Sequence, residues 1–167
     1  MGILADRLDS MRVRVAVPGG DVQALLSGRT SVTLSFADGY YARSTEQDLQ
    51  HKLAALAQLL WVGRTREYNN ALQEAFSNPT LNGPARIGAR DIAFAEARAQ
   101  LVATGASDDG RIRLTVQGMR HWTVRVAPGT IRALEEDEFI AGVRAAAARL
   151  IQDQLDQMAL LKARSYA

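Results

Sequence analysis

An internal repeat with a period of 90 residues is the feature of this sequence that most constrains its fold. When the sequence is shifted against itself by 90 positions, glycines align with glycines and apolar positions with apolar positions, without a gap. In both copies the apolar residues first alternate with a period of two and then change to helical spacing at the same relative place. We therefore expect two similar units in tandem. The aligned glycines are Gly20 with Gly110, Gly28 with Gly118, and Gly39 with Gly129.

The first unit, residues 1–76, predicts a three-stranded antiparallel meander followed by a long helix. Glycine marks the turns between the strands because it adopts positive φ at little cost. Thr45 is the expected N-cap of the helix, with Glu46 and Asp48 in its first turn, and the helix runs to about Phe76. The predicted strands span 12–17, 22–26 and 31–36, and a predicted loop covers 37–43.

The second unit, residues 90–167, shows the same pattern. A long helix begins at the acidic run Glu135 to Glu138, where carboxylates complement the helix dipole, and continues to about Lys162. The segment 94–104 is open to two interpretations: its alanines favour a helix, whereas the repeat places a strand near its end. The clear strands of this unit span 111–116 and 121–126.

Each predicted meander has one apolar face that must be covered, and the helix that follows it carries an apolar stripe. Because a core of this size contributes only about 3–5 kcal/mol by itself, the two units are expected to pack together. The predicted fold class is therefore α+β, with two meander–helix units packed as a pseudo-dimer. Residues 77–89, which contain two prolines and two glycines, are the expected linker. The stripes are Leu49, Leu53, Leu56 and Leu60, and Phe139, Val143, Ala147, Leu150 and Ile151.

The C-terminal parts of both predicted helices carry additional apolar residues. These residues bury either against each other or against another chain, so a homo- or hetero-oligomer through the long helices is one of the two interpretations. They are Trp61, Tyr68, Leu72 and Phe76 in the first helix, and Leu155, Met158, Leu160 and Leu161 in the second.

The composition argues against an enzyme. The sequence has no cysteine and only two histidines, His51 and His121, which leaves too few residues for a thiolate metal site, a histidine zinc site or a Ser-His-Asp triad. We interpret the acidic run Glu135 to Glu138 as a helix N-terminus, and no glycine-rich phosphate-binding motif is present. We expect no catalytic residues, no metal and no cofactor.

The apolar segments are too short for a membrane protein. The longest of them, residues 53–62, is interrupted by Gln58 and has about half the length of a membrane span. The N-terminal residues show neither the apolar run nor the cleavage site of a secretory signal. We expect a cytoplasmic protein that does not insert into membranes.

The cationic residues are nearly all arginine: of 20 in total, only Lys52 and Lys162 are lysine, and the net charge is +2. On the predicted strands, arginines alternate with apolar residues, which places them on the sheet face away from the core. There they are candidate contacts for phosphates or for an acidic partner. A solvated polar face and arginine-rich codon usage are the alternative interpretations. The candidates are Arg12, Arg14, Arg111, Arg113, Arg120 and Arg125, with Arg132 as a further contributor.

Tyr40 and Tyr41 form an aromatic pair in the predicted loop after Gly39. We interpret the pair as exposed. It either caps the core or contacts a partner, and the sequence favours neither interpretation.

Several of these segments resemble the YbaB/EbfC family. The resemblance lies in the segment 101–105 and in the strand pair from Arg111 to Gly129, which contains Gly118 and Trp122 and precedes an acidic helix start. This pattern is similar in particular to the Esp-type proteins encoded with actinobacterial type VII (ESX) secretion systems. The segment 17–53 of the first unit is similar to the same group.

The resemblance implies a fold in which a strand meander lies between helices and in which units pair as dimers. It implies a cytoplasmic, non-enzymatic accessory or chaperone-like protein that binds a protein partner in type VII secretion. The alternative that it implies is a nucleoid-associated protein that binds duplex DNA. In that alternative the strand arginines act together with Arg86, Arg90 and Arg98.

Overall fold

The computed structural model describes residues 3–75 and 88–166, which form an α+β fold. The first half contains α1 (Ile3–Asp9), β1 (Arg12–Ala16), β2 (Val22–Ser27), β3 (Ser31–Phe36), α2 (Tyr40–Arg43) and α3 (Glu46–Ala75). The second half contains α4 (Ala89–Gln100), β4 (Val102–Ala106), β5 (Ile112–Gln117), β6 (His121–Val126), α5 (Thr130–Ala133) and α6 (Glu136–Ser165).

The elements of the two halves recur at the period found in the sequence. Each strand of the first half, the helical turn α2 and the long helix α3 reappear 90 residues later with the same length. Both sheets are antiparallel meanders, with the orders β1-β2-β3 and β4-β5-β6. The strand registers also correspond, since Val13 pairs with Leu26 and Ala103 pairs with Val116.

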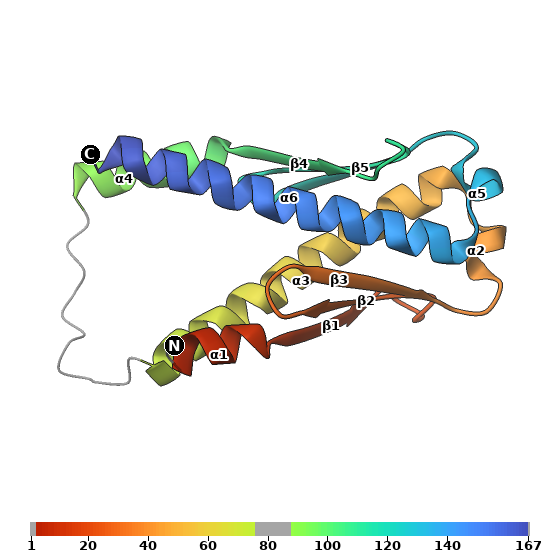
Figure 1. Cartoon of the computed structure of the whole chain (residues 1–167), viewed down its shortest axis with the longest axis horizontal. Coiled ribbons are helices and arrows are strands. Elements are labelled where there is room, and N and C mark those ends of the chain that lie inside the picture. The colour runs from red at the N-terminus through yellow and green to blue at the C-terminus, as the bar shows by residue number, and fades with distance from the viewer. Residues whose placement is uncertain (1–2, 76–87, 167) are drawn as a thin grey trace.

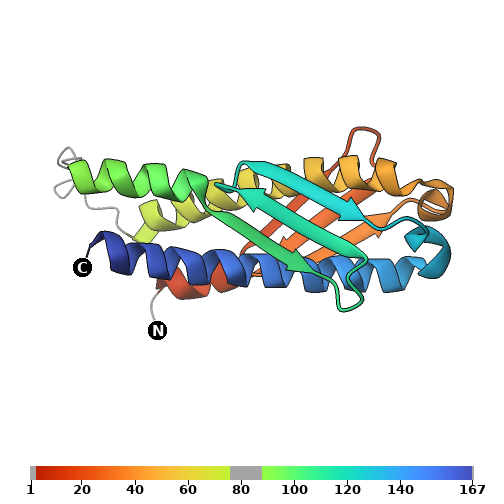
Figure 2. The same ribbon diagram turned by 90° about the horizontal axis from the view of Figure 1, so that it is seen from above.

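The molecule has three layers, with a sheet on each outer side and the two long helices between them (Figures 1 and 2). Each long helix contacts both sheets: α3 lies against β1 and β6, and α6 lies against β4 and β3. The short helices α1 and α4 flank α3 and α6 respectively. The helix that follows one meander therefore also covers an edge strand of the other meander.

This arrangement produces one hydrophobic core that includes residues of both halves. Leu49 and Phe139, which occupy equivalent positions in α3 and α6, are fully buried. Phe139 of the second half packs against Tyr41 and Phe36 of the first half, with ring centroids 5.2 and 6.0 Å apart. Burial of the inward face of each strand against these helices explains the period-two pattern of the sequence.

The predicted strands and long helices are confirmed, together with the N-cap at Thr45, whose Oγ1 accepts a hydrogen bond from the Asp48 N–H at 3.1 Å. The acidic run also starts its helix as predicted, because the Glu138 carboxylate accepts a hydrogen bond from the Glu135 N–H at 3.0 Å. The segment 94–104, for which the sequence allowed either a helix or a strand, contains both: α4 ends at Gln100 and β4 begins at Val102.

Two predictions of local structure need correction. The loop predicted over 37–43 contains the helical turn α2, which is closed by a hydrogen bond from the Arg43 N–H to the Gly39 carbonyl oxygen. The linker predicted over 77–89 overlaps α4, which begins at Ala89, and its residues 77–87 lie outside the described part of the chain. The end of the first helix predicted at Phe76 also lies outside it.

Candidate binding surfaces

The strand arginines project away from the core, as the alternation predicts. On β1, Val13 is buried whereas Arg12 and Arg14 are exposed. On the second sheet, Arg113 and Arg125 are exposed, and they are direct cross-strand partners in the β5–β6 register. None of these four arginines has an ion-pair or hydrogen-bond partner among the described residues.

The outer faces of both sheets are free of carboxylates. None of the 18 aspartate and glutamate residues lies on a strand; within residues 3–75 and 88–166 they occupy helices and turns. The outward residues of the second sheet near Arg113 and Arg125 are instead threonines such as Thr115 and Thr123, which pair across the strands. These faces are therefore suited to anionic groups.

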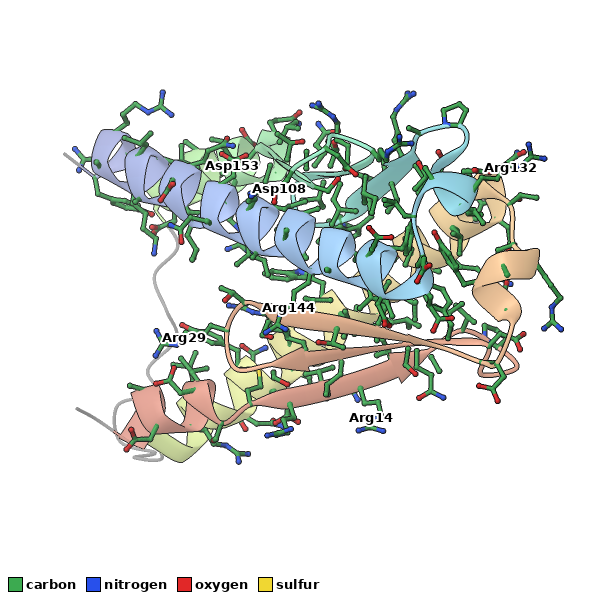
Figure 3. All side chains as sticks on the ribbon, turned by 45° about the vertical axis from the view of Figure 1, so that its right-hand side comes forward. Arg14, Arg29, Asp108, Arg132, Arg144 and Asp153 are labelled. Carbon is green, nitrogen blue, oxygen red and sulfur yellow. The ribbon has the colours of Figure 1, made fainter. Side chains whose placement is uncertain are left out.

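The strand arginines lie on two separate faces of the molecule rather than on one surface. Arg14 projects from the first sheet, on the opposite side of the molecule from the second sheet (Figure 3). Two basic faces result because the long helices lie between the sheets and separate them (Figure 2). Arg132 lies on α5, where its charge acts on the carboxylate of Glu46 rather than on either sheet face.

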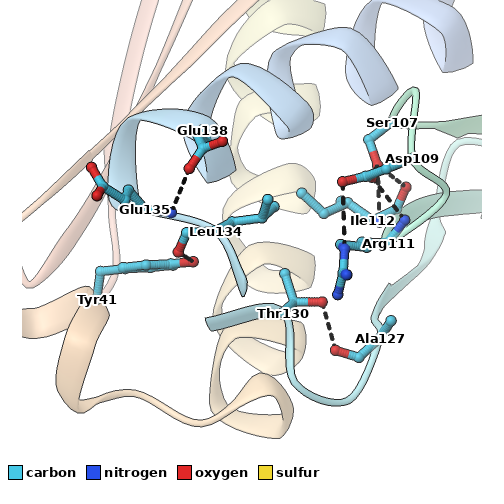
Figure 4. A network of polar contacts seen from close by, with 10 residues as sticks. All are labelled: Tyr41, Ser107, Asp109, Arg111, Ile112, Ala127, Thr130, Leu134, Glu135 and Glu138. Carbon is cyan, nitrogen blue, oxygen red and sulfur yellow. Dashed lines mark hydrogen bonds and ion pairs between the residues drawn. The ribbon is translucent and has the colours of Figure 1, made fainter. Parts of the chain in front are cut away.

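Arg111 differs from the other candidates because it is half-buried and paired with a carboxylate. Its Nε lies 3.6 Å from Asp109, and its N–H donates a hydrogen bond to the same carboxylate at 3.0 Å (Figure 4). The Arg111 N–H and the Ser107 hydroxyl hold the pKa of Asp109 below its usual value. Arg120 is exposed in the β5–β6 turn, Arg90 and Arg98 are exposed on α4, and Arg86 lies outside the described residues.

Tyr40 and Tyr41 belong to α2, and the expectation that both are exposed is wrong. Tyr41 is only 5% exposed, and its hydroxyl donates a hydrogen bond to the Leu134 carbonyl oxygen at 2.8 Å (Figure 4). Burial, with a smaller effect of nearby glutamates, raises the pKa of Tyr41 to about 12. The Tyr40 hydroxyl donates to Asp48 at 2.7 Å, and its ring packs against the core. The pair therefore caps the core.

Sequence reasoning missed the polar contacts that join the two halves. The Glu46 carboxylate of α3 accepts hydrogen bonds from the N–H groups of Gly129 and Ile131 at 3.0 and 3.4 Å. Backbone N–H groups, its own first, hold the pKa of Glu46 below its usual value. Gln50 accepts a hydrogen bond from the Val126 N–H at 2.9 Å. In the sequence these residues show only helical spacing and the acidic first turn of a helix.

Eight large apolar side chains are exposed among the described residues, five of them on α4, β4 and the C-terminal part of α6 with the residue after it, and α6 contacts both α4 and β4. They lie on α3 from its middle onward, on the C-terminal half of α6 and just beyond it, on α4, and at the first residue of β4. The long helices pack on the sheets rather than on each other, so these side chains do not cover one another along α3 and α6. We call this set the apolar end; it comprises Leu59, Val62, Tyr68, Ile92, Val102, Leu155, Leu160 and Tyr166.

The sequence also predicted a group of apolar residues in the C-terminal parts of both long helices. Of this group, Leu161 is buried and Trp61 packs against the core. Leu155 and Leu160, in contrast, are 49% and 63% exposed. The sequence left open whether this group buries internally or against another chain. Within the described residues, only some of these apolar side chains are buried inside the chain.

No protein-family model, curated protein or solved structure matches this chain. Among the described residues, no helix is long and apolar enough to cross a membrane. Within the same residues, no group of three or more histidine, aspartate or glutamate side chains is arranged to hold a metal ion.

Proposed function

We propose that this chain consists of two tandem YbaB/EbfC-like units packed as a pseudo-dimer. The observations that support this proposal are the recurrence of every strand and long helix at 90 residues and the equal strand orders. The exchange of helix contacts between the halves, with α3 on β6 and α6 on β3, also supports it. Such an exchange is how two small units share one core.

We further propose that the protein is a cytoplasmic, non-enzymatic accessory of type VII (ESX) secretion that binds a protein partner. The observation that carries this proposal is the apolar end, where Leu160, Leu155 and Ile92 are each about half exposed or more. Large apolar groups gathered on one part of a surface are typical of protein-interaction sites. The resemblance to Esp-type proteins supports the class of partner.

The double variant Leu155→Asp/Leu160→Asp is expected to lose the protein partner while keeping its fold. Both side chains are exposed, so a charge there opposes docking without disturbing the core. The tagged chain is recovered from a cell that carries a type VII secretion system, and the partner is then purified and titrated. We expect an equimolar complex with the parent chain and at least about 30-fold weaker binding by the variant, equivalent to about 2 kcal/mol.

Ala141→Asp is the matched control, because Ala141 is exposed near the other end of the same helix. It is expected to bind the partner as the parent chain does. Recovery of the bare chain alone contradicts the proposal, and so does a partner that the double variant retains at full affinity.

The alternative function, binding of duplex DNA, is favoured by the cross-strand arginine pair. Arg113 and Arg125 stand side by side on a sheet face without carboxylates, and neither has an acidic partner among the described residues. Two adjacent guanidinium groups can contact the phosphates of a nucleic-acid backbone without reading its sequence.

If the alternative holds, Arg113→Ala/Arg125→Ala weakens duplex binding and reduces its salt dependence. Each lost phosphate contact lowers the magnitude of the slope of log K against log salt concentration by about 1. The slope of the double variant should therefore be smaller by about 2. Fluorescence anisotropy of a labelled duplex between about 50 and 200 mM salt measures the slope. Arg66→Ala, an exposed arginine on α3, is the control. The absence of binding by the parent chain at the lowest salt rules the alternative out.

A further inference from the structure

A partly open cavity of about 80 Å³ lies between α3, α6 and both sheets. Both halves line it at equivalent positions of the repeat: Ala24 with Leu114, Val32 with Trp122, and Leu60 with Leu150. The cavity therefore lies where the two halves meet. The lining surface is almost entirely apolar, and Arg64 is the one charged residue among those that line it.

Arg64 is placed as a binding group rather than as a structural one. Its Nε is buried and has no hydrogen-bond partner among the described residues, and its Cζ lies 5.0 Å from the centroid of the Trp61 ring. The neighbouring groups that act on its charge are Tyr68 and a second cation, Arg29, which is itself paired with Asp9 at 2.9 Å. Burial lowers the pKa of Arg64, but a guanidinium group stays protonated at neutral pH.

The repeat shows that the fold does not require an arginine at this position. The equivalent residue in α6 is Gln154, which is buried whereas Arg64 is partly exposed, and the equivalent of Trp61 is Ile151. Arg64 and Trp61 thus give the cavity one cationic side. A cation whose Nε is buried without a hydrogen-bond partner is suited to binding an anion.

We propose that this cavity binds a fatty-acid carboxylate, with the end of its unbranched acyl chain inside and its carboxylate on the guanidinium group of Arg64. The apolar lining suits methylene groups, and the planar fork of an arginine pairs with both oxygens of a carboxylate. The volume of about 80 Å³ is about half of the ~150 Å³ that holds a benzene ring, which favours a slender chain over a ring.

The surroundings of the cavity favour this ligand over other anionic molecules. Only one cation lines it, which matches the single charge of a carboxylate better than the charge of a phosphate monoester. Its volume of about 80 Å³ is too small to accommodate a peptide segment. The site is also separate from the apolar end and from the sheet faces, so it does not depend on either function proposed above.

Titration with octanoate tests the proposal, with binding followed by calorimetry on the full chain. We expect octanoate to bind the parent chain below its micellar concentration, and acetate, which lacks the chain, not to bind. Arg64→Gln, which installs the residue of the equivalent position, should weaken octanoate at least 10-fold. The same substitution should leave the weaker binding of neutral 1-octanol unchanged, because it removes only the contact to the head group.

Two further variants separate the site from general effects. Arg66→Gln removes an exposed arginine from the same helix and should leave octanoate binding within twofold of the parent value. Ala24→Leu, which copies the equivalent Leu114 and fills the cavity, should abolish binding of both octanoate and octanol. Circular dichroism confirms that each variant is folded, and Ala147→Val replaces Ala24→Leu if the latter is not. Equal affinity of the Arg64→Gln variant and the parent chain for octanoate overturns the proposal, as does no binding or binding that survives the filled cavity.

Discussion

Gly105→Ala is expected to destabilise the protein by about 3 kcal/mol or more, although it adds a single methyl group. A Cβ at this position of β4 would lie 2.5 Å from the backbone nitrogen of Leu150 and closer still to the carbonyl oxygen of Ala146. Both atoms belong to the backbone of α6, so no side-chain rotation relieves the clash. The helix would have to move away from the strand, and the core would open with it.

Gly110→Ala is the control for the effect of glycine itself. Gly110 has a φ of +73° and nothing within 4 Å of an added Cβ, so its replacement costs only the strain of a left-handed residue, about 1–2 kcal/mol. Urea denaturation of the two variants measures the difference. Equal free energies of unfolding would contradict the close approach of α6 to β4.

The first half also has a close contact between helix and strand, but at a different place and with the glycine on the helix. There Gly63 of α3 faces β1, and a Cβ on it would lie 2.5 Å from Cγ1 of Val13. The residue equivalent to Gly105 is Val15, and the residue equivalent to Gly63 is Asp153. The glycines that allow a close contact therefore lie on different elements in the two halves, and α3 lies less closely along β1 than α6 does along β4.

Local patterns of the sequence were sufficient to predict the strands and the long helices. Period-two alternation located both meanders, and Thr45 marked a helix start because its hydroxyl satisfies a free N–H group. The short helices were missed for a physical reason. The helices α1 and α2 have 7 and 4 residues, and segments of so few turns depend on tertiary contacts rather than on propensity.

The candidate site was less predictable because it depends on how distant segments pack. Alternation correctly placed Arg14 and Arg113 on outer faces, but the interposed helices put those faces on opposite sides of the molecule. Tyr41 is an exposed aromatic in the sequence pattern, yet Phe139, almost 100 residues later, covers it. Arg64 carried no signal because helical spacing cannot show which side chains border a cavity.

Phe139→Ala is expected to cost about 3–5 kcal/mol, since it removes a fully buried ring from the contact between the halves. The ring belongs to α6, but its aromatic neighbours Tyr41 and Phe36 belong to the first half. The free energy of unfolding that this variant loses therefore comes from the core shared by both halves rather than from one unit. Leu160→Ala on the same helix is the control, because Leu160 is 63% exposed and its loss should cost less than about 0.5 kcal/mol.

The same variant distinguishes one cooperative core from two independent units. Trp61 lies in α3 and Trp122 in β6, so Trp122→Phe and Trp61→Phe chains each keep one fluorescent reporter, in the first and second half respectively. In each background Phe139→Ala should move the urea midpoint of the remaining tryptophan by the same amount, because the core unfolds as a unit. If the substitution shifts only the Trp122 transition and leaves that of Trp61 in place, the halves fold separately, and the packing of α6 on the first sheet contributes little to stability.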